Sequence, residues 1–285
     1  MPEGDTVWRT AHRLSQALAG EPLILADLRW PSLATAALAG DTTLEVASRG
    51  KHILHRLSSG LTLHSHLRME GQWRIESTEG LAPRQLAHPD LRAALGTRRW
   101  TALGMRLGML DLVPTAREAE LVGHLGPDLL GPDWEAEIAV ANLTRAGTPV
   151  GAALLDQTNL AGIGTMWAAE VLFLERVNPW RSTSELDTDR LKAIVSRAQT
   201  LMDAARHHAV QAPTGVRRKG ENTYVHKRSG RPCRRCGTPV RVAQIGPDLR
   251  ERAMFYCPAC QGGLAPGDDG RPQQPLGVIR KGPYG

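Results

Sequence analysis

Apolar residues recur at helical spacing almost from the start of the chain. Val7, Ala11, Leu14 and Leu18 share one face of residues 3–19, so the pattern predicts an amphipathic helix. From residue 21 to residue 113 the pattern changes to short apolar or alternating runs, separated by Gly, Pro and Ser. These runs are 23–25, 53–57, 62–67, 91–95 and 109–113. They predict a mostly antiparallel β-sandwich with flanking helices.

After Pro114 the pattern becomes helical. Candidate helices, separated by turns that contain Gly or Pro, span residues 115–124, 134–144, 150–158, 165–176 and 185–208. The whole pattern indicates an α+β protein. We expect a β-sandwich domain over 1–114, a helical domain over 115–211, a basic loop over 212–228, a compact cysteine-containing module over 229–262 and a disordered tail over 263–285.

Composition narrows the class of protein. The chain has 285 residues, of which 41% are hydrophobic and only 4 are Cys. The apolar content excludes disorder of the whole chain, and the low number of cysteines excludes a small disulfide scaffold. No apolar run is long enough to span a membrane, and the acidic start Met1-Pro2-Glu3 lacks the features of a secretory signal. We therefore expect a soluble, cytoplasmic protein that does not bind membranes.

The positive charge is concentrated in one segment. Residues 214–252 contain eleven basic and three acidic residues, whereas the whole chain has a net charge of +6. Such a segment is typical of a surface that binds a polyanion, most often nucleic acid. A solvated basic face is the alternative that charge alone leaves open.

The four cysteines form two pairs, Cys233-x2-Cys236 and Cys257-x2-Cys260, with 20 residues between the pairs. Two such pairs in a reducing compartment indicate one tetrahedral zinc ion held by four thiolates. A redox role would need a single CxxC beside a βαβ pattern, which is absent. Four protein ligands leave no open coordination position, so we expect a structural zinc in a finger whose intervening residues form a β-hairpin.

Removal of Met1 would expose Pro2 as a secondary amine. An α-amino group has a pKa near ~8, so part of it is neutral and nucleophilic at pH 7. Attack on an aldehyde by such an amine gives an iminium, which acidifies the adjacent carbon. Glu3 could transfer protons beside it. Taken alone this pair is weak evidence, because Glu3 also suits the first turn of a helix.

Several segments, in order, resemble the bacterial DNA glycosylase/AP lyase family of formamidopyrimidine-DNA glycosylase and endonuclease VIII. The first three are Met1-Pro2-Glu3-Gly4, Arg49-Gly50-Lys51 and His64-Ser65-His66-Leu67-Arg68-Met69-Glu70-Gly71. The central ones are Gly126-Pro127-Asp128-Leu129 and the stretch from Leu154 through Gly162-Ile163-Gly164 to Glu170, which resembles the family's helix–two-turns–helix element. The last is the pair of CxxC motifs, which resembles its C-terminal zinc finger.

The resemblance implies a role for particular residues. Pro2 would be the nucleophile at C1′ of a damaged nucleotide, Glu3 the proton donor and acceptor, and Lys51 a phosphate contact that assists catalysis. Arg252 would grip phosphates beside the lesion. Arg68, Met69 and Glu70 would occupy the loop that fills the gap left by the flipped nucleotide. The implied partner is damaged double-stranded DNA bound by a monomer near the nucleoid, and activity on single-stranded or bubble DNA stays open.

Departures from the family pattern refine this expectation. Asp5-Thr6 stands where another acid is usual, and Thr165 follows Gly164 where an Asn that holds a phosphate is typical. Met105-Arg106-Leu107-Gly108 stands where the formamidopyrimidine branch has Arg-Arg-Phe-Gly. Together with Gly4, this difference favours the endonuclease VIII branch and oxidised pyrimidines. The 20 residues between the Cys pairs exceed the commoner sixteen, so the hairpin tip could differ.

Two alternatives remain at this point. A non-catalytic zinc-finger protein that binds DNA or DNA damage would explain the basic segment and the cysteines equally well. It would not require a Pro2 amine beside Glu3 and Lys51. His64 and His66 share one face of a predicted strand; a metal pair is conceivable, but two His without a nearby acid or Cys pattern are more often structural or phosphate-facing.

Overall fold

The structure is a computed structural model that describes residues 2–275, and its contacts divide the chain into two compact units. Unit 1 covers residues 1–132 and unit 2 covers residues 133–285. The sequence predicts that the β-sandwich domain ends at Pro114, whereas unit 1 ends at residue 132. The structure differs because the segment that follows Pro114 packs back onto the sandwich, where Glu118 binds Arg56 and Asp128 binds Gly50.

Unit 1 contains two four-stranded antiparallel sheets. The first has the order β1-β6-β7-β5 and the second the order β2-β3-β4-β8. Their strands are β1 (Leu25–Leu28), β2 (Thr43–Arg49), β3 (His52–Leu57), β4 (Leu61–His66), β5 (Gln72–Ser77), β6 (Leu91–Gly96), β7 (Trp100–Met105) and β8 (Met109–Pro114). The expected β-sandwich is confirmed, since every ladder in it is antiparallel.

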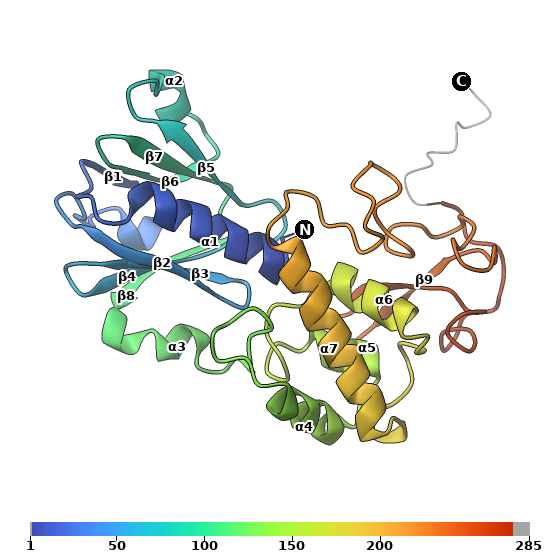
Figure 1. Ribbon diagram of the computed structural model, residues 1–285. Coiled ribbons are helices and arrows are strands. Elements are labelled where there is room, and N and C mark those ends of the chain that lie inside the picture. The colour runs from blue at the N-terminus through green and yellow to red at the C-terminus, as the bar shows by residue number, and fades with distance from the viewer. Residues whose placement is uncertain (1, 276–285) are drawn as a thin grey trace, which may run out of the picture. The chain divides into compact units, whose positions relative to one another are not determined.

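The core of unit 1 lies between the sheets and the first helix, α1 (Gly4–Leu18). The apolar face that the sequence predicts, Val7, Ala11, Leu14 and Leu18, is buried in one cluster with side chains of both sheets. Figure 1 shows α1 lying alongside the two sheets. At ~25 cal/mol per Å² of apolar surface, burial of such a face stabilises the helix far more than its intrinsic propensity does. The start of α1 is therefore firmly anchored.

Short helices complete unit 1. They are η1 (Pro31–Leu33), α2 (Pro83–Leu86), η2 (Thr115–Arg117) and α3 (Ala119–Val122). The last two occupy the range in which the sequence predicts one helix, 115–124. Glu118, at their junction, accepts hydrogen bonds from Arg56 of β3 at 2.9 and 2.8 Å and from Thr62 of β4 at 2.5 Å. These bonds attach the segment to the polar face of the second sheet.

Unit 2 begins with the predicted helical region. Its helices are α4 (Ala136–Ala146), α5 (Val150–Leu155), α6 (Thr165–Leu174), η3 (Thr183–Glu185) and α7 (Thr188–Ala205). Nine of the ten residues of α6 are buried, so this helix is the centre of the unit rather than an amphipathic surface element. No described helix is both long enough and apolar enough to pass through a membrane.

The C-terminal part of unit 2 is a two-stranded hairpin of β9 (Arg241–Ile245) and β10 (Arg252–Tyr256). The sequence predicts a disordered tail from residue 263 onward. In the structure, residues 263–275 instead pack along this hairpin (Figure 1). Ala265 is 4% exposed, and both the amide oxygen and the amide nitrogen of Gln273 bond to the backbone of Val242. Polar anchors of this kind hold a segment that has few apolar residues. The rest of the expected tail, residues 276–285, lies outside the described residues.

Candidate functional site

Pro2 lies directly before the first turn of α1. Glu3 is the N-cap in an extended conformation, its carbonyl accepts from the amide of Val7 at 3.0 Å, and its side chain is buried. Asp5, in the first turn, is also buried. Because α1 is anchored in the core, Pro2 has a defined position at the end of a rigid element. Met1 lies outside the described residues, so the expected loss of Met1 stays a prediction.

Lys51 lies in the tight turn between β2 and β3. Gly50 has φ +58°, a conformation that glycine adopts without strain. Its amide donates to Oδ2 of Asp128 at 2.7 Å, and the Arg49 guanidinium donates to the carbonyl of Gly126 at 3.1 Å. The Gly-Pro-Asp motif, which the sequence groups with the helical domain, thus belongs to unit 1 and fixes the turn that carries Lys51.

Arg68, Met69 and Glu70 form the loop after β4. Met69 is 66% exposed, whereas the loop is closed by a 2.8 Å hydrogen bond from the amide of Gly71 to the carbonyl of Leu67. A Cβ at position 71 would lie 2.4 Å from that carbonyl oxygen, so only glycine fits there. The exposed thioether therefore stands on a short, well-defined turn.

The stretch Met105–Gly108 does not present an apolar residue to solvent. Leu107 is buried in the core, and Arg106 has a positive φ and an exposed side chain. That side chain donates to Asp90 at 2.7 Å and to Glu70 at 3.3 Å. Because Leu107 is buried in the core, Met69 is the exposed apolar side chain of these two loops.

Three histidines and one aspartate meet on the second sheet. In the ladders His52 faces His66, and His64 faces Asp111. Oδ2 of Asp111 is 3.0 Å from Nδ1 of His64, and Nε2 of His64 is 2.8 Å from Nδ1 of His52. The rings of His52 and His66 cross edge to face with 5.0 Å between their centres. The shared face of His64 and His66 is confirmed, while His52 and Asp111 were not singled out from sequence.

This histidine cluster is electrostatically crowded. Burial, followed by the neighbouring His66 and His64, lowers the pKa of His52 to about 3. Burial and then the Arg68 guanidinium lower the pKa of His66 to about 4. Both rings are therefore neutral at pH 7, and they can act as hydrogen-bonding groups without adding positive charge.

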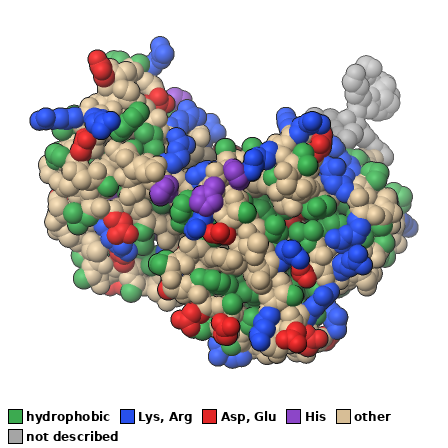
Figure 2. All heavy atoms as spheres, viewed as in Figure 1, with side chains coloured by type: hydrophobic (Ala, Val, Ile, Leu, Met, Phe, Trp, Pro, Cys, Tyr) green, Lys and Arg blue, Asp and Glu red, His purple; other side chains and the backbone are tan. Residues whose placement is uncertain are grey.

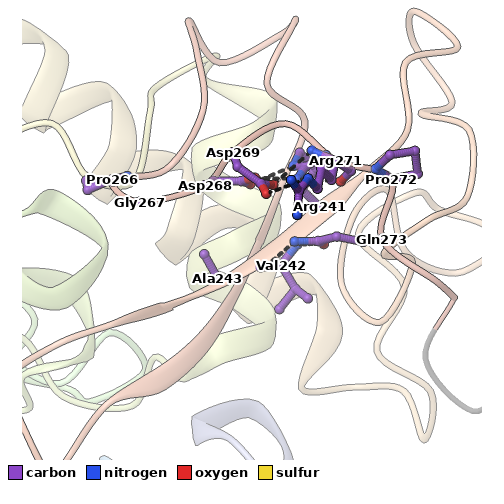
Figure 3. A pocket seen from close by; sticks show the side chains of 10 residues that line it. All are labelled: Arg241, Val242, Ala243, Pro266, Gly267, Asp268, Asp269, Arg271, Pro272 and Gln273. Carbon is purple, nitrogen blue, oxygen red and sulfur yellow. Dashed lines mark hydrogen bonds and ion pairs between the residues drawn. The ribbon is translucent and has the colours of Figure 1, made fainter.

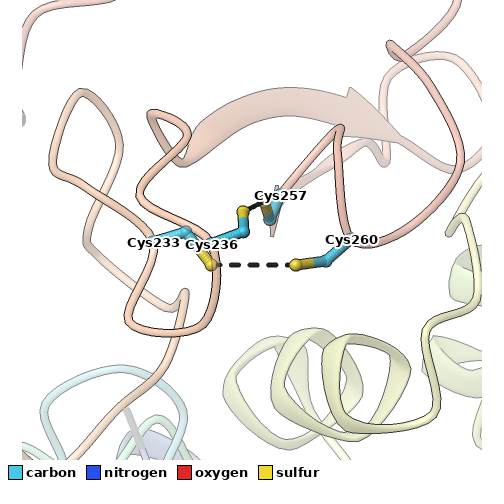
Figure 4. A group of neighbouring side chains, drawn as sticks. All are labelled: Cys233, Cys236, Cys257 and Cys260. Atoms are coloured by element: carbon cyan, nitrogen blue, oxygen red, sulfur yellow. Dashed lines mark hydrogen bonds between the residues drawn. The ribbon is translucent and has the colours of Figure 1, made fainter.

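The four cysteines converge within unit 2 (Figure 4). Their sulfur atoms all lie within 4.8 Å of one another, and among the described residues they are the group positioned to hold a metal ion. The backbone amide of Arg235 donates to the sulfur of Cys233 at 3.4 Å, as suits a thiolate. Gly237, with φ +80°, closes the first CxxC turn through a 2.9 Å bond to the carbonyl of Cys233. This donor set fits a tetrahedral site closed to outside ligands.

The cysteine module is attached to α6 and to the segment that follows it by polar and cationic contacts. Arg235 stacks over the ring of Phe173 at 4.2 Å and donates to that residue's carbonyl at 3.0 Å. Gln261 accepts from the amide of Cys257 and donates to the carbonyl of Val177, both at 2.8 Å. The orientation of the hairpin within unit 2 is thus set by contacts outside the metal site.

Glu170 anchors the basic loop to α6. This carboxylate is fully buried and accepts hydrogen bonds from the backbone amides of Tyr224, Val225 and His226 at 2.7 to 2.8 Å. Burial raises the pKa of Glu170, and the three amide donors oppose that shift. In the sequence, Glu170 is only the last residue of a motif. In the structure, its hydrogen bonds hold residues 224–226 of the basic loop in place.

The basic segment divides into surface and structural residues. Nine of its eleven basic residues are exposed, among them Arg252, which starts β10 opposite Ile245. Figure 2 shows Lys and Arg side chains gathered on the visible surface of the C-terminal part. The other two are Arg228, which is half-buried, and Arg241, which is buried against Asp268. A cavity of about 450 Å³ lies between β9 and residues 266–273, with Arg241 and Asp268 in its wall (Figure 3).

Thr165 is the first residue of α6 and is 7% exposed. Its N-cap is Gly164, which is extended at φ −130°. A hydroxyl at this place can donate one hydrogen bond toward an anion near the helix N-terminus. Thr165 and Arg252 lie in unit 2, whereas Pro2, Glu3, Lys51 and the loop of residues 68–70 lie in unit 1.

Two family models match the chain. Residues 1–108 match the N-terminal domain of formamidopyrimidine-DNA glycosylase, and residues 125–213 match the H2TH domain of the same family. Together they cover most of unit 1 and about half of unit 2.

Relatives match over almost their full length. The "Probable endonuclease 8 2" of Streptomyces coelicolor is 50% identical over 278 residues, which is 95% of this chain and 98% of the relative. The "DNA-(apurinic or apyrimidinic site) lyase Nei2" of Mycolicibacterium smegmatis is 40% identical over 262 residues, covering 92% of this chain and 99% of the relative.

Solved structures share the fold. A Lactococcus lactis formamidopyrimidine-DNA glycosylase, non-covalently bound to DNA that contains an AP site, aligns with a TM-score of 0.75 and 21% identity. The alignment covers 91% of this chain and 99% of the other. The same enzyme in a complex with DNA that contains an oxidised pyrimidine aligns with a TM-score of 0.76 and 22% identity, over 92% and 100% of the two chains.

Proposed function

This chain belongs to the formamidopyrimidine-DNA glycosylase and endonuclease VIII family, and on that premise we propose that it is a bifunctional DNA glycosylase and AP lyase of base excision repair. The observation that carries the proposal is Pro2 at the anchored start of α1, in a chain 40% identical to a relative named as an AP lyase. Its partner is damaged DNA, and we propose the cytoplasm, at the nucleoid, as its location.

The chemistry begins with extrusion of the damaged nucleotide. A base inside the stack cannot be reached, and flipping it out costs a few kcal/mol. Met69, exposed on its short turn, is suited to enter the gap and recover part of this energy. The nitrogen of Pro2 then attacks C1′, the glycosidic bond breaks, and the base leaves with its electron pair and a proton.

Elimination follows from the charge on the intermediate. The nitrogen of Pro2, now an iminium joined to the opened sugar, withdraws electrons and acidifies C2′. Removal of a C2′ proton expels the 3′ phosphate, and a second elimination can expel the 5′ phosphate. Glu3, adjacent to the nucleophile, gives and accepts the protons of these steps. The Lys51 ammonium holds a phosphate oxygen near the reacting sugar.

The remaining contacts hold the DNA backbone. Arg252 on the hairpin and Thr165 at the start of α6 are proposed to bind phosphates beside the lesion. The four cysteines are proposed to hold one structural zinc ion, which fixes the finger and takes no part in bond breaking. Measurement of bound metal should give about one zinc per chain, and binding of zinc by fewer than four thiolates would contradict this assignment.

Oxidised pyrimidines are the proposed substrates. The burial of Leu107, in the position where the formamidopyrimidine branch has an aromatic wedge, supports this preference. A panel of duplex oligonucleotides with single defined lesions tests it. We expect faster release of oxidised pyrimidines than of oxidised purines, and the reverse order would refute the preference.

Borohydride trapping on a duplex with one abasic site tests the reaction itself. A reducible iminium should give a covalent adduct with the zinc-loaded protein, and Pro2→Gly should abolish it. A form that retains Met1 should also give no adduct, because its Pro2 nitrogen is an amide. Tight DNA binding without any adduct would instead support a non-catalytic damage-binding protein.

A further inference from the structure

The histidine cluster contains a continuous series of hydrogen bonds that the reaction above does not use. It runs from Asp111 on β8 to His64 on β4 and then to His52 on β3, with heavy-atom distances of 3.0 and 2.8 Å. His64, in the middle, is 1% exposed, whereas the Asp111 side chain is 40% exposed. The series therefore connects a carboxylate at the surface to the residue that follows Lys51.

The hydrogen positions in this series follow from its first member. An ionised carboxylate only accepts hydrogen bonds, so Nδ1 of His64 must carry a hydrogen. When the rings are neutral, Nε2 of His64 is then an acceptor, and Nδ1 of His52 must donate to it. Nε2 of His52 is left as a bare acceptor, and no described residue bonds to it.

His66, which faces His52 in the ladder, carries its hydrogen on the other ring nitrogen. The backbone amide of Arg68 donates to Nδ1 of His66 at 2.9 Å, so the hydrogen of His66 lies on Nε2. His52 and His66, which face each other in the ladder, thus offer one acceptor and one donor. Both are half-buried, and both are neutral at pH 7 for the reasons given above.

We propose that Asp111 and His64 are positioning residues that fix the tautomer of His52. This tautomer leaves Nε2 of His52 as a hydrogen-bond acceptor beside Lys51. The proposal rests on the proposed function, because the acceptor matters only if Lys51 contacts the sugar-phosphate being cleaved. Nε2 of His52, as a neutral hydrogen-bond acceptor, would repel a phosphate oxygen. Its partner must therefore be a hydrogen-bond donor, such as a sugar hydroxyl of the opened deoxyribose or a bound water.

The geometry favours this role over a metal site. The ligand atoms that converge closely enough for an ion, among the residues the structure describes, are the four cysteine sulfurs. In the histidine cluster, Nδ1 of His52 and both ring nitrogens of His64 are occupied by hydrogen bonds within the series. A chain of this kind is similar in principle to the carboxylate that holds a catalytic imidazole in one tautomer.

Nitrogen NMR of protein with labelled histidine tests the tautomers directly, at pH 8 where imidazole is neutral. We expect His64 and His52 to carry their hydrogens on Nδ1 and His66 on Nε2, with signals assigned through His52→Gln and His64→Gln. An imidazole in water prefers the Nε2–H form, so two Nδ1–H rings would be a specific signature. Nε2–H forms of both His64 and His52 would overturn the proposal.

Kinetics on an abasic-site duplex test the effect on the reaction. Asp111→Asn removes the charge that orders the series, and we expect kcat to fall about tenfold while KM stays within about twofold. Asp111→Glu should restore part of kcat. The matched control is Asp27→Asn, which removes a carboxylate of similar exposure, 37% against 40%, from a strand of the other sheet.

Normalising kcat to the fraction of protein that forms the borohydride adduct removes any contribution from misfolded chains. An unchanged kcat in Asp111→Asn, or an equal fall in Asp27→Asn, would overturn the positioning role. Failure of the wild-type chain to cleave at all would refute the proposed function and this role with it. The histidine tautomers would then still decide whether the series exists.

Discussion

Arg241 and Asp268 form a buried ion pair that joins β9 to the segment beyond the second CxxC motif. Nε of Arg241 donates to Oδ2 of Asp268 at 2.6 Å, and the two side chains are only 7% and 6% exposed. The hydroxyl of Tyr256 donates to the same carboxylate at 2.7 Å. Arg241 therefore stabilises the finger and is withdrawn from the basic surface.

Asp268→Ala should loosen the finger strongly. It leaves the Arg241 guanidinium buried without its counter-ion, and loss of one partner of a buried pair costs about 3–5 kcal/mol. Limited proteolysis of the zinc-loaded protein should show faster cleavage between residues 241 and 275. Asp269→Ala is the control, because Asp269 pairs with Arg271 at the surface. Equal protease resistance of the two variants would contradict the assigned role.

Glu118 should make the stability of unit 1 depend on pH. Hydrogen bonds from Arg56 lower the pKa of this carboxyl below its ordinary value, with a further bond from Thr62. A lowered pKa stabilises the fold above the ordinary pKa of Glu, near ~4.3, and this contribution is lost as the pH falls through the lowered value. Glu118→Gln should therefore lower the Tm at pH 7 by an amount that shrinks below about pH 4. A difference in Tm independent of pH would exclude this linkage.

Cys233→Ser should affect the finger more than the sandwich. Loss of one thiolate should weaken binding of the proposed zinc ion, and small metal-binding modules owe much of their stability to their metal. Calorimetry should show a lower transition temperature for unit 2 and an almost unchanged one for unit 1, together with weaker DNA binding. Equal shifts of both transitions would count against this prediction.

Arg252→Ala should reduce the salt dependence of DNA binding. Each phosphate contact releases condensed counterions, so loss of one lowers the slope of log K against log salt by about 1. Titration of a duplex at several salt concentrations measures this slope. Arg29→Ala, in unit 1 and paired with Asp27, is the control. A lower affinity at an unchanged slope would exclude the phosphate contact.

Met69→Ala should slow excision from duplex DNA about three- to tenfold in kcat/KM, which corresponds to about 1 kcal/mol. The proposed role of Met69 is to offset the cost of unstacking, so its loss should matter little on single-stranded DNA with an abasic site. Comparison of the two substrates provides the measurement. Equal losses on both would indicate a damaged active site instead of a missing wedge.

Periodicity predicted the elements that have one apolar face. The helix at 3–19 became α1 at Gly4–Leu18, and the strand at 53–57 became β3 at His52–Leu57. The strands β2, β5 and β7 were not singled out. β5 alternates exposed and half-buried residues without a strong apolar face, and β7 contains Gly and Thr in its buried positions. Their place in the sheets depends on long-range pairing.

The candidate site was predicted through motifs, and the contacts that support it were not. Nothing local in the sequence indicates that Asp128 binds the turn before Lys51, because the two segments are about 77 residues apart. The same is true of Asp111, which reads as one polar residue in the apolar run 109–113. Its role depends on the pairing of β4 with β8, which brings it beside His64.

The side chain of Gln273 occupies both hydrogen-bonding groups of Val242. An exposed edge of a two-stranded hairpin is a template on which another polypeptide can add a strand. With its donor and acceptor satisfied from within the same chain, this edge cannot recruit a neighbouring molecule at that position. Truncation before Gln273 would therefore open this edge of the hairpin to self-association.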